Sequence, residues 1–139
     1  MMDTLFHKVF EVNAAAGEDA LWRIISANSS IPRYWHGTRW IKNIGGERYQ
    51  IRFVFPAKGV VVFVYDVGRK TAKEIYLKGP FKGEKTISIS SHNDESLLRV
   101  EWNIRFSFPY SIFKATMRDH MSQGTSNAIN RIIAEASKS

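Results

Sequence analysis

One histidine and one tyrosine are the side chains in this sequence best suited to acid–base chemistry. A helix through His120, Met117 and Met121 would place these three side chains on one broad face. Histidine titrates near neutral pH, so His120 could act as an acid or base, or give a bound molecule its one polar contact. The spacing equally fits a hydrogen-bonded core histidine, and no carboxylate is placed to pair with it. Tyr65, in a strand-like stretch, is the second candidate.

Other catalytic patterns are missing from the sequence. It contains no cysteine, which excludes a thiolate nucleophile, a thiolate metal site and disulfides. A nucleophile elbow, a phosphate-binding glycine loop and a metal-spaced cluster of His, Asp and Glu are also absent. The acidic residues of the predicted strands are expected at turns or on the solvent face, and they are Glu47, Asp66, Glu74, Glu84 and Glu101. We therefore expect no metal and no cofactor, and favour a binding protein over an enzyme.

The elements that must position these side chains follow from hydrophobic periodicity. Apolar and polar residues alternate through most of residues 38–108, which predicts an antiparallel meander with one dry face and one wet face. Gly45 and Gly46 mark a hairpin turn. The predicted strands are 5–12, 40–44, 47–55, 60–67, 74–77, 86–90 and 98–108. Ile75 and Leu77 are assigned to the inner face of their strand, opposite Glu74 and Tyr76.

Helical spacing dominates the rest of the chain. Residues 109–139 predict one helix of roughly 40 Å, too long to be a connector. Its apolar stripe must pack against the strands, and it comprises Phe113, Met117, His120, Met121, Gly124, Ala128 and Ile132. Two short helices are predicted near residues 18–27 and 31–37, the first opening on Glu18 and Asp19, where negative charge favours a helix N-terminus.

This order of elements resembles a known architecture. One strand, two short helices, a six-stranded antiparallel run and a long helix are similar to the helix-grip fold of the START/Bet v 1-like (SRPBCC, polyketide cyclase and lipid transport) superfamily. Residues 10–14 with 18–22 look like its opening strand and first helix, and residues 31–35 like its second helix. The resemblance implies an α+β domain over residues 1–139, in which a curved sheet of about seven strands wraps the C-terminal helix around a cavity for apolar molecules.

A cavity of this kind needs apolar walls with a few polar groups. The residues expected to line it are Tyr34, Trp35, Phe53, Phe55, Phe63, Tyr65, Ile75, Leu77, Ile87, Ile89, Trp102, Ile104, Phe106, Phe113, Met117, His120, Met121 and Gly124. The same side chains could instead fill the core.

Several of these residues allow two interpretations. Tyr34 and Trp35 are either a lid over the cavity or a plug that closes the core. Gly124, costly inside a helix, lets a ligand or the sheet approach the backbone, marks a bend, or reflects tight packing. His36 lies either at a cavity mouth or on the surface.

Composition limits the remaining possibilities. The formal charge is +7, and residues 39–91 hold eleven basic and four acidic side chains. Such an excess could meet phosphates, but Arg48, Arg52, Arg99 and Arg105 are explained as solvated side chains of the outer sheet face. No apolar run reaches the roughly 20 residues needed to cross a bilayer, and residues 1–10 lack the pattern of a signal peptide. A cytoplasmic protein without an integral membrane segment is expected, and its edge strands could support a homodimer.

The sequence thus favours non-catalytic binding or transport of a hydrophobic small molecule, such as a lipid, isoprenoid or polyketide-like compound. A cyclase or hydratase that uses a pocket histidine or tyrosine is the alternative. A third possibility, a nucleic-acid or acidic-partner binder acting through the outer arginines, ranks lowest, since the inner aromatic residues would be unavailable for base stacking.

Overall fold

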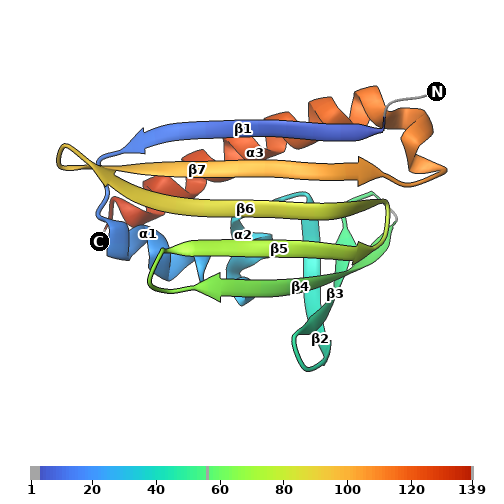
Figure 1. Cartoon of the computed structure of the whole chain (residues 1–139), viewed down its shortest axis with the longest axis horizontal. Coiled ribbons are helices and arrows are strands. Elements are labelled where there is room, and N and C mark those ends of the chain that lie inside the picture. The colour runs from blue at the N-terminus through green and yellow to red at the C-terminus, as the bar shows by residue number, and fades with distance from the viewer. Residues whose placement is uncertain (1–3, 56, 139) are drawn as a thin grey trace.

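The structure, a computed structural model, describes residues 4–55 and 57–138. Seven strands form one antiparallel sheet in the order β1-β7-β6-β5-β4-β3-β2, and a long helix lies across one face of it (Figure 1). The strands are β1 (Leu5–Ala14), β2 (Thr38–Gly45), β3 (Arg48–Phe53), β4 (Lys58–Asp66), β5 (Thr71–Lys78), β6 (Phe81–His92) and β7 (Glu95–Phe106). The predicted α+β helix-grip fold is confirmed.

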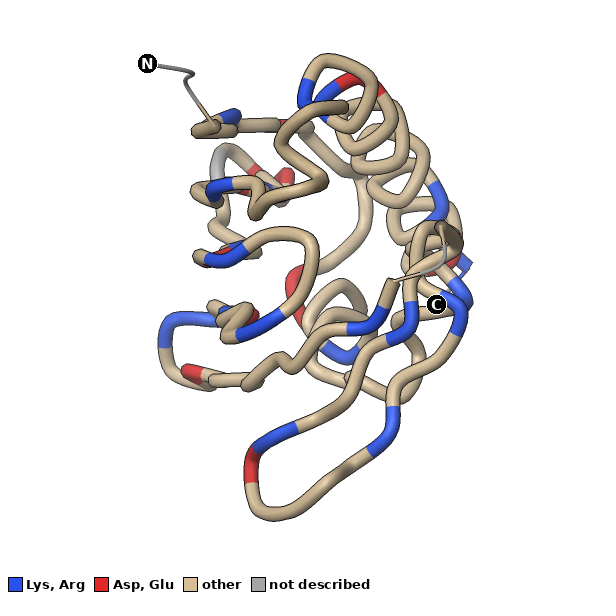
Figure 2. The backbone as a smooth tube through the Cα atoms, turned by 90° about the vertical axis from the view of Figure 1, so that its right-hand side faces the viewer, with Lys and Arg blue, Asp and Glu red and all other residues tan. Residues whose placement is uncertain are grey.

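The sheet is strongly curved. In Figure 1 the β2–β3 hairpin runs steeply across the direction of β5, β6 and β7, and Figure 2 shows the hairpin projecting from the rest of the molecule. Gly45 and Gly46 make its turn with positive φ angles of 129° and 57°, which side chains rarely tolerate. The curvature lets a single sheet cover the helix from one edge strand, β1, to the other, β2.

The helices occupy the predicted places with shorter bounds. Between β1 and β2 lie α1 (Glu18–Ile25), a 3₁₀ turn η1 (Asn28–Ser30) and α2 (Ile31–Tyr34). After β7, a second 3₁₀ turn, η2 (Tyr110–Phe113), precedes the long helix α3 (Lys114–Ala136). Residues 1–3 and 139, at the ends of the predicted domain and helix, lie outside the described residues. Assigning Phe113 to the buried stripe was wrong, because it ends η2 and is 62% exposed.

The core is filled at one end of the helix. Ile129 and Ile132 of α3 are at most 2% exposed, and Leu21 of α1 and Leu98 of β7 are completely buried in the same cluster. The apolar stripe of α3 therefore shifts after Gly124, so that the C-terminal half of the helix packs tightly. Its N-terminal half is different: Met117, Met121 and Gly124 are only partly buried.

The face assignment of β5 was wrong. Tyr76 is 4% exposed and Glu74 5%, whereas Ile75 and Leu77 are only partly buried. Both faces of β5 carry large apolar side chains, so alternation alone did not separate them. The buried position of Glu74 is possible because Lys85 of the neighbouring strand β6 pairs with it.

Candidate functional site

A cavity of about 400 Å³ lies between the sheet and the N-terminal half of α3. This volume falls in the range of small-molecule binding sites. Its walls come from the α2–β2 connection, β3 and the loop after it, β5, β6, β7 and α3. The lining residues are Trp35, His36, Gly37, Thr38, Phe53, Val54, Phe55, Tyr76, Phe81, Lys85, Trp102, His120, Met121, Gly124 and Thr125.

The exposure of these residues shows where the cavity opens. His36, Gly37, Val54 and His120 are exposed and mark the mouth, whereas the residues of the inner wall are buried. The backbone N–H of Val54 donates to the carbonyl oxygen of Gly37 at 2.9 Å, which holds two sides of the rim together. The mouth thus lies between the chain after α2, the β3–β4 loop and α3.

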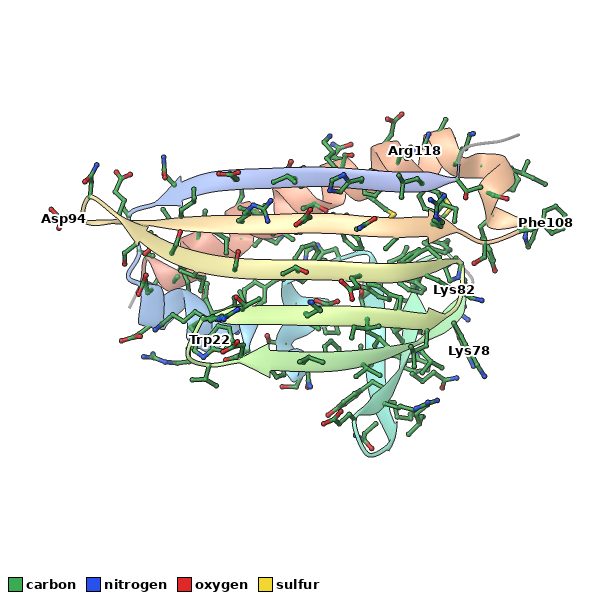
Figure 3. All side chains as sticks on the ribbon, viewed as in Figure 1. Trp22, Lys78, Lys82, Asp94, Phe108 and Arg118 are labelled. Atoms are coloured by element: carbon green, nitrogen blue, oxygen red, sulfur yellow. The ribbon has the colours of Figure 1, made fainter. Side chains whose placement is uncertain are left out.

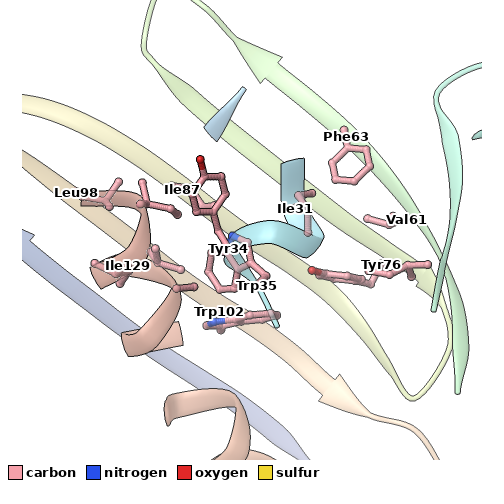
Figure 4. Close-up of a cluster of buried hydrophobic side chains, with 14 of the residues drawn as sticks. Ile31, Tyr34, Trp35, Val61, Phe63, Tyr76, Ile87, Leu98, Trp102 and Ile129 are labelled. Carbon is pink, nitrogen blue, oxygen red and sulfur yellow. The ribbon is translucent and has the colours of Figure 1, made fainter. Parts of the chain in front are cut away.

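Aromatic rings form most of the inner wall. Trp35 and Trp102 meet edge to face, with ring centroids 6.4 Å apart. Both side chains are labelled in the close-up of Figure 4. Tyr76 lies nearly parallel to Trp102, at 14° and 6.1 Å. Phe81 meets Tyr76 edge to face at 4.8 Å and lies 5.4 Å from the ring of Phe53. The wall therefore offers flat, apolar surface to a bound molecule.

A buried ion pair interrupts this apolar wall. Lys85 Nζ lies 3.1 Å from Glu74 Oε2, and their side chains are 3% and 7% exposed. The Tyr76 hydroxyl donates to Glu74 Oε1 at 2.7 Å. Lys85 Nζ also sits 3.5 Å from the ring centroid of Trp35 and 4.9 Å from that of Trp102, within cation–π range. Lys85 lines the cavity and Glu74 does not, so the wall presents an ammonium whose charge the adjacent carboxylate balances.

Burial shifts the protonation of this cluster. Desolvation lowers the pKa of Lys85 from its ordinary value, and the nearby Glu74 carboxylate opposes that effect. Desolvation raises the pKa of Tyr76 well above its ordinary value, and Glu74 raises it further by its charge and by accepting the hydroxyl hydrogen bond. At neutral pH Tyr76 is therefore a hydrogen-bond donor and cannot serve as a base.

The helix side of the cavity carries a second polar link. Trp102 Nε1–H donates to Thr125 Oγ1 at 2.9 Å, and the Thr125 hydroxyl donates to the carbonyl oxygen of Met121 at 2.7 Å. Among the described residues, every buried side-chain nitrogen and oxygen has a hydrogen-bond partner. This satisfied network fixes the orientation of the indole that forms the cavity floor.

The predicted site residues divide into two groups. Seven of them line the cavity: Trp35, Phe53, Phe55, Trp102, His120, Met121 and Gly124. The others are not part of this lining, and they are Tyr34, Phe63, Tyr65, Ile75, Leu77, Ile87, Ile89, Ile104, Phe106, Phe113 and Met117. Most of the second group pack in the core cluster or against it. Whether any residue of either group binds a ligand stays a prediction.

Three residues of the buried polar cluster, Lys85, Glu74 and Tyr76, were not predicted to lie inside. Lys85 shares the parity of Ile87 and Ile89, which were correctly assigned inward, so alternation could have placed it inside. Lys85 lies just before the predicted strand 86–90 and was assigned to neither face, and burial of a lone ammonium is costly. Tyr76 was not predicted to line the cavity because the inner face of β5 was assigned to Ile75 and Leu77. Glu74 was wrongly assigned to the solvent face.

Contacts in the structure narrow the alternative interpretations of Tyr34, Trp35 and Gly124. Arg131 Nη1 donates to the Tyr34 carbonyl at 3.0 Å, and Arg33 lies 3.3 Å from Glu135, so two contacts fasten α2 to α3. These contacts favour the plug over the lid for Tyr34 and Trp35. At Gly124, an added Cβ would meet no atom within 4 Å, which excludes tight packing as the reason for glycine there.

Neither predicted acid–base residue lies in the inner wall. His120 is exposed at the mouth, and Tyr65 is outside the cavity, with its ring stacked on Phe63 at 6.3 Å. Within residues 4–55 and 57–138 no three His, Asp or Glu side chains are arranged to hold a metal ion. No described helix is long and apolar enough to cross a membrane.

The outer face of the sheet carries both charges. Arg99 lies 3.0 Å from Glu101 and 3.8 Å from Glu11, and Lys73 lies 3.8 Å from Glu84. In Figure 2 basic and acidic positions occur close together along the strands. Part of the basic excess is thus neutralised locally, which weakens the case for a phosphate-binding surface there.

Comparison with known proteins gives fold-level similarity. No protein-family model and no curated protein sequence matches the chain. Among solved structures, a START superfamily protein from Mycobacterium smegmatis has a TM-score of 0.68 at 13% identity, covering 91% of this chain and 98% of that chain. Zhui aromatase/cyclase from Streptomyces sp. R1128 has a TM-score of 0.75 at 11% identity, and the match covers 96% of this chain and 94% of that chain. Truncated norcoclaurine synthase from Thalictrum flavum has a TM-score of 0.69 at 16% identity, and the match covers 97% of this chain and 94% of that chain. The chain has a START/Bet v 1-like fold, and identities this low establish nothing about activity.

Proposed function

We propose that this START/Bet v 1-like protein binds a small, flat, largely apolar molecule in the cavity between its sheet and α3. The observation that carries the proposal is a cavity of about 400 Å³ whose inner wall combines aromatic faces with the Lys85 ammonium, whose charge is balanced by Glu74 outside the lining. Burial of aromatic and apolar ligand surface against such a wall supplies binding free energy without any charge on the ligand.

The ion pair defines the polar group that the ligand should carry. The ammonium of Lys85 has three N–H donors, and Glu74 takes one of them. A neutral oxygen acceptor, such as a ketone or phenol oxygen, would match a remaining donor. A carboxylate would add an uncompensated negative charge beside Glu74 in a desolvated wall. The expected ligand is therefore a neutral aromatic or polyene-like carbonyl or phenol compound.

Native mass spectrometry of protein purified from its own cells, followed by organic extraction, tests whether the cavity is occupied. A co-purifying neutral molecule supports the proposal. Titration with three probes of one skeleton then tests the polar preference: fluorene, fluorenone and fluorene-9-carboxylate. Fluorenone should bind tightest. Binding of none of them, together with an empty native spectrum, would overturn the proposal.

Acid–base catalysis of the cyclase or hydratase type is the second candidate. The Lys85–Glu74–Tyr76 cluster favours it, because an ammonium that binds a carbonyl oxygen also polarises that carbonyl. Tyr76 is held protonated, so it would act only as a donor. Exchange of α-hydrogens of fluorenone-like ketones is not possible, so 2-tetralone in deuterated buffer is the suitable probe. Faster deuterium uptake with the wild type than with Lys85→Met would support catalysis, and equal uptake would remove it.

A further inference from the structure

Three large apolar side chains stand in solvent on a short stretch of chain after β7. Phe108 is 81% exposed, Ile112 57% and Phe113 62%. We call these three residues the apolar tip. Scattered exposed apolar residues are ordinary, but three within six positions form a patch that needs a reason.

The tip is presented by a well-anchored segment. Ser107 N–H donates to the Pro80 carbonyl at 2.8 Å, and Ser111 N–H donates to the Ser107 carbonyl at 3.0 Å. Ser111 is buried, and the Tyr110 ring lies 6.2 Å from that of Phe55. The backbone is thus fixed between the β5–β6 turn and the β3–β4 loop while the three apolar side chains point away from the core.

The surroundings of the tip are basic. Three segments that lie at this end of the sheet, residues 54–55 with 57–59, residues 77–83 and residues 105–118, contain six Lys or Arg and no Asp or Glu. Lys78 and Lys82 are exposed, and Figure 3 shows both at the same end of the molecule as Phe108. Of the acidic residues that directly follow these segments, Asp119 is exposed and Glu84 is paired with Lys73 at 3.8 Å.

We propose that the apolar tip and its lysines dock the protein on an anionic lipid bilayer. Exposed phenylalanine and isoleucine insert at the headgroup boundary, and nearby lysines are drawn to anionic headgroups. A protein partner fits less well, since lysine is depleted in protein interfaces. The cavity mouth is close by: Phe55, which contacts Tyr110 of η2, also lines the cavity. Docking would bring the mouth to the membrane surface, and it does not depend on what the cavity holds.

Vesicle co-sedimentation of the full chain tests this proposal. Vesicles of phosphatidylcholine alone are compared with vesicles that also contain phosphatidylglycerol. The wild type should sediment with the anionic vesicles and should be released by salt. Phe108→Ser with Phe113→Ser should weaken binding roughly tenfold or more. Lys78→Gln with Lys82→Gln should weaken vesicle binding about thirtyfold at low salt, because two surface lysines no longer attract the anionic headgroups.

Matched controls lie elsewhere on the surface. Ile44 and Val67 are 50% and 69% exposed, so Ile44→Ser with Val67→Ser removes exposed apolar surface away from the tip. Arg23→Gln with Arg48→Gln removes two exposed charges, one on α1 and one on the β2–β3 hairpin. Equal binding by tip and control variants, or no preference for anionic vesicles, would overturn the proposal. So would a wild-type dimer in sedimentation velocity that Phe108→Ser converts to a monomer, because a second copy would then cover the tip.

Discussion

Lys85 and Trp35 make the closest cation–ring contact of the inner wall, with the ammonium nitrogen 3.5 Å from the ring centroid. Trp35 directly follows α2, and Lys85 lies in the middle of β6, so this contact joins the plug to the sheet. The same ammonium pairs with Glu74. One buried charge thus connects the cavity wall, the plug and the central strands.

Removal of only one partner of the ion pair should be costly. Lys85→Met leaves the Glu74 carboxylate buried and without its cation, so we expect a loss of about 3–5 kcal/mol in the free energy of unfolding. Urea unfolding followed by tryptophan fluorescence measures it.

The matched variant is Lys85→Met combined with Glu74→Gln. Glutamine keeps an oxygen acceptor for the Tyr76 hydroxyl but carries no charge. The double variant should recover most of the lost stability. If it proves as unstable as Lys85→Met alone, the cost arises from packing and not from the unpaired carboxylate. The double variant should also bind fluorene and fluorenone with similar affinity, because the donor for the carbonyl is gone.

Tyr76 should make the protein sensitive to alkali. Its pKa is raised in the folded state by burial, so the folded protein keeps this proton when the unfolded chain releases it. The stabilisation is complete below about pH 10, the ordinary value for tyrosine, and is lost as pH rises above it. Tyr76→Phe should flatten the fall in the free energy of unfolding above pH 10 relative to wild type.

Two other groups, Lys85 and Tyr65, also contribute to the change in stability in this alkaline pH range. Their contributions must be distinguished from that of Tyr76. Lys85 has a lowered pKa, so its contribution increases as pH rises toward the ordinary lysine value and opposes the loss. Burial raises the pKa of Tyr65 in the same sense as that of Tyr76. Tyr65→Phe is therefore the control. If Tyr76→Phe leaves the alkaline slope unchanged while Tyr65→Phe flattens it, Tyr76 is not the responsible group.

Much of the fold was predictable because one signal was strong. In β7 every second residue from Leu98 to Phe106 is apolar, and all of these are at most 5% exposed. The long helix was equally clear, and the turn at Gly45 and Gly46 fixed the β2–β3 hairpin. The helix-grip arrangement itself was predicted from the resemblance of this order of elements to the START/Bet v 1-like superfamily.

The site was harder to predict, because its polar residues depend on partners in another strand. Glu74 and Lys85 each look like solvent-exposed residues when read alone, and only the β5–β6 pairing, in which they face each other, makes both burials possible. The predicted start of the long helix was wrong for a related reason. Phe113 has helical spacing to Met117, but the chain forms η2 there and leaves its ring in solvent.

Thr125 should hold the cavity floor through its hydroxyl. Thr125→Val keeps the shape but removes the acceptor for Trp102 Nε1–H, so we expect a loss of about 1–3 kcal/mol in the free energy of unfolding. Thr125→Ser keeps the hydroxyl and gives up one methyl group, at a cost of about 0.8 kcal/mol. Chemical denaturation compares the two. Equal stability of both variants would mean that cavity water replaces the threonine hydroxyl.

Gly124 offers the sharpest separation of stability from binding. It lies within α3, where glycine costs about 1 kcal/mol relative to alanine, and a Cβ there meets open space. Gly124→Ala should therefore raise the free energy of unfolding by about 1 kcal/mol. Gly124→Phe should place a ring in the cavity, keep the fold and abolish fluorenone binding, measured by calorimetry. Asn127→Phe, at an exposed position of the same helix, should leave binding unchanged. If Gly124→Phe binds fluorenone like wild type, the ligand site lies outside the cavity, and an apolar molecule must be held elsewhere on the protein.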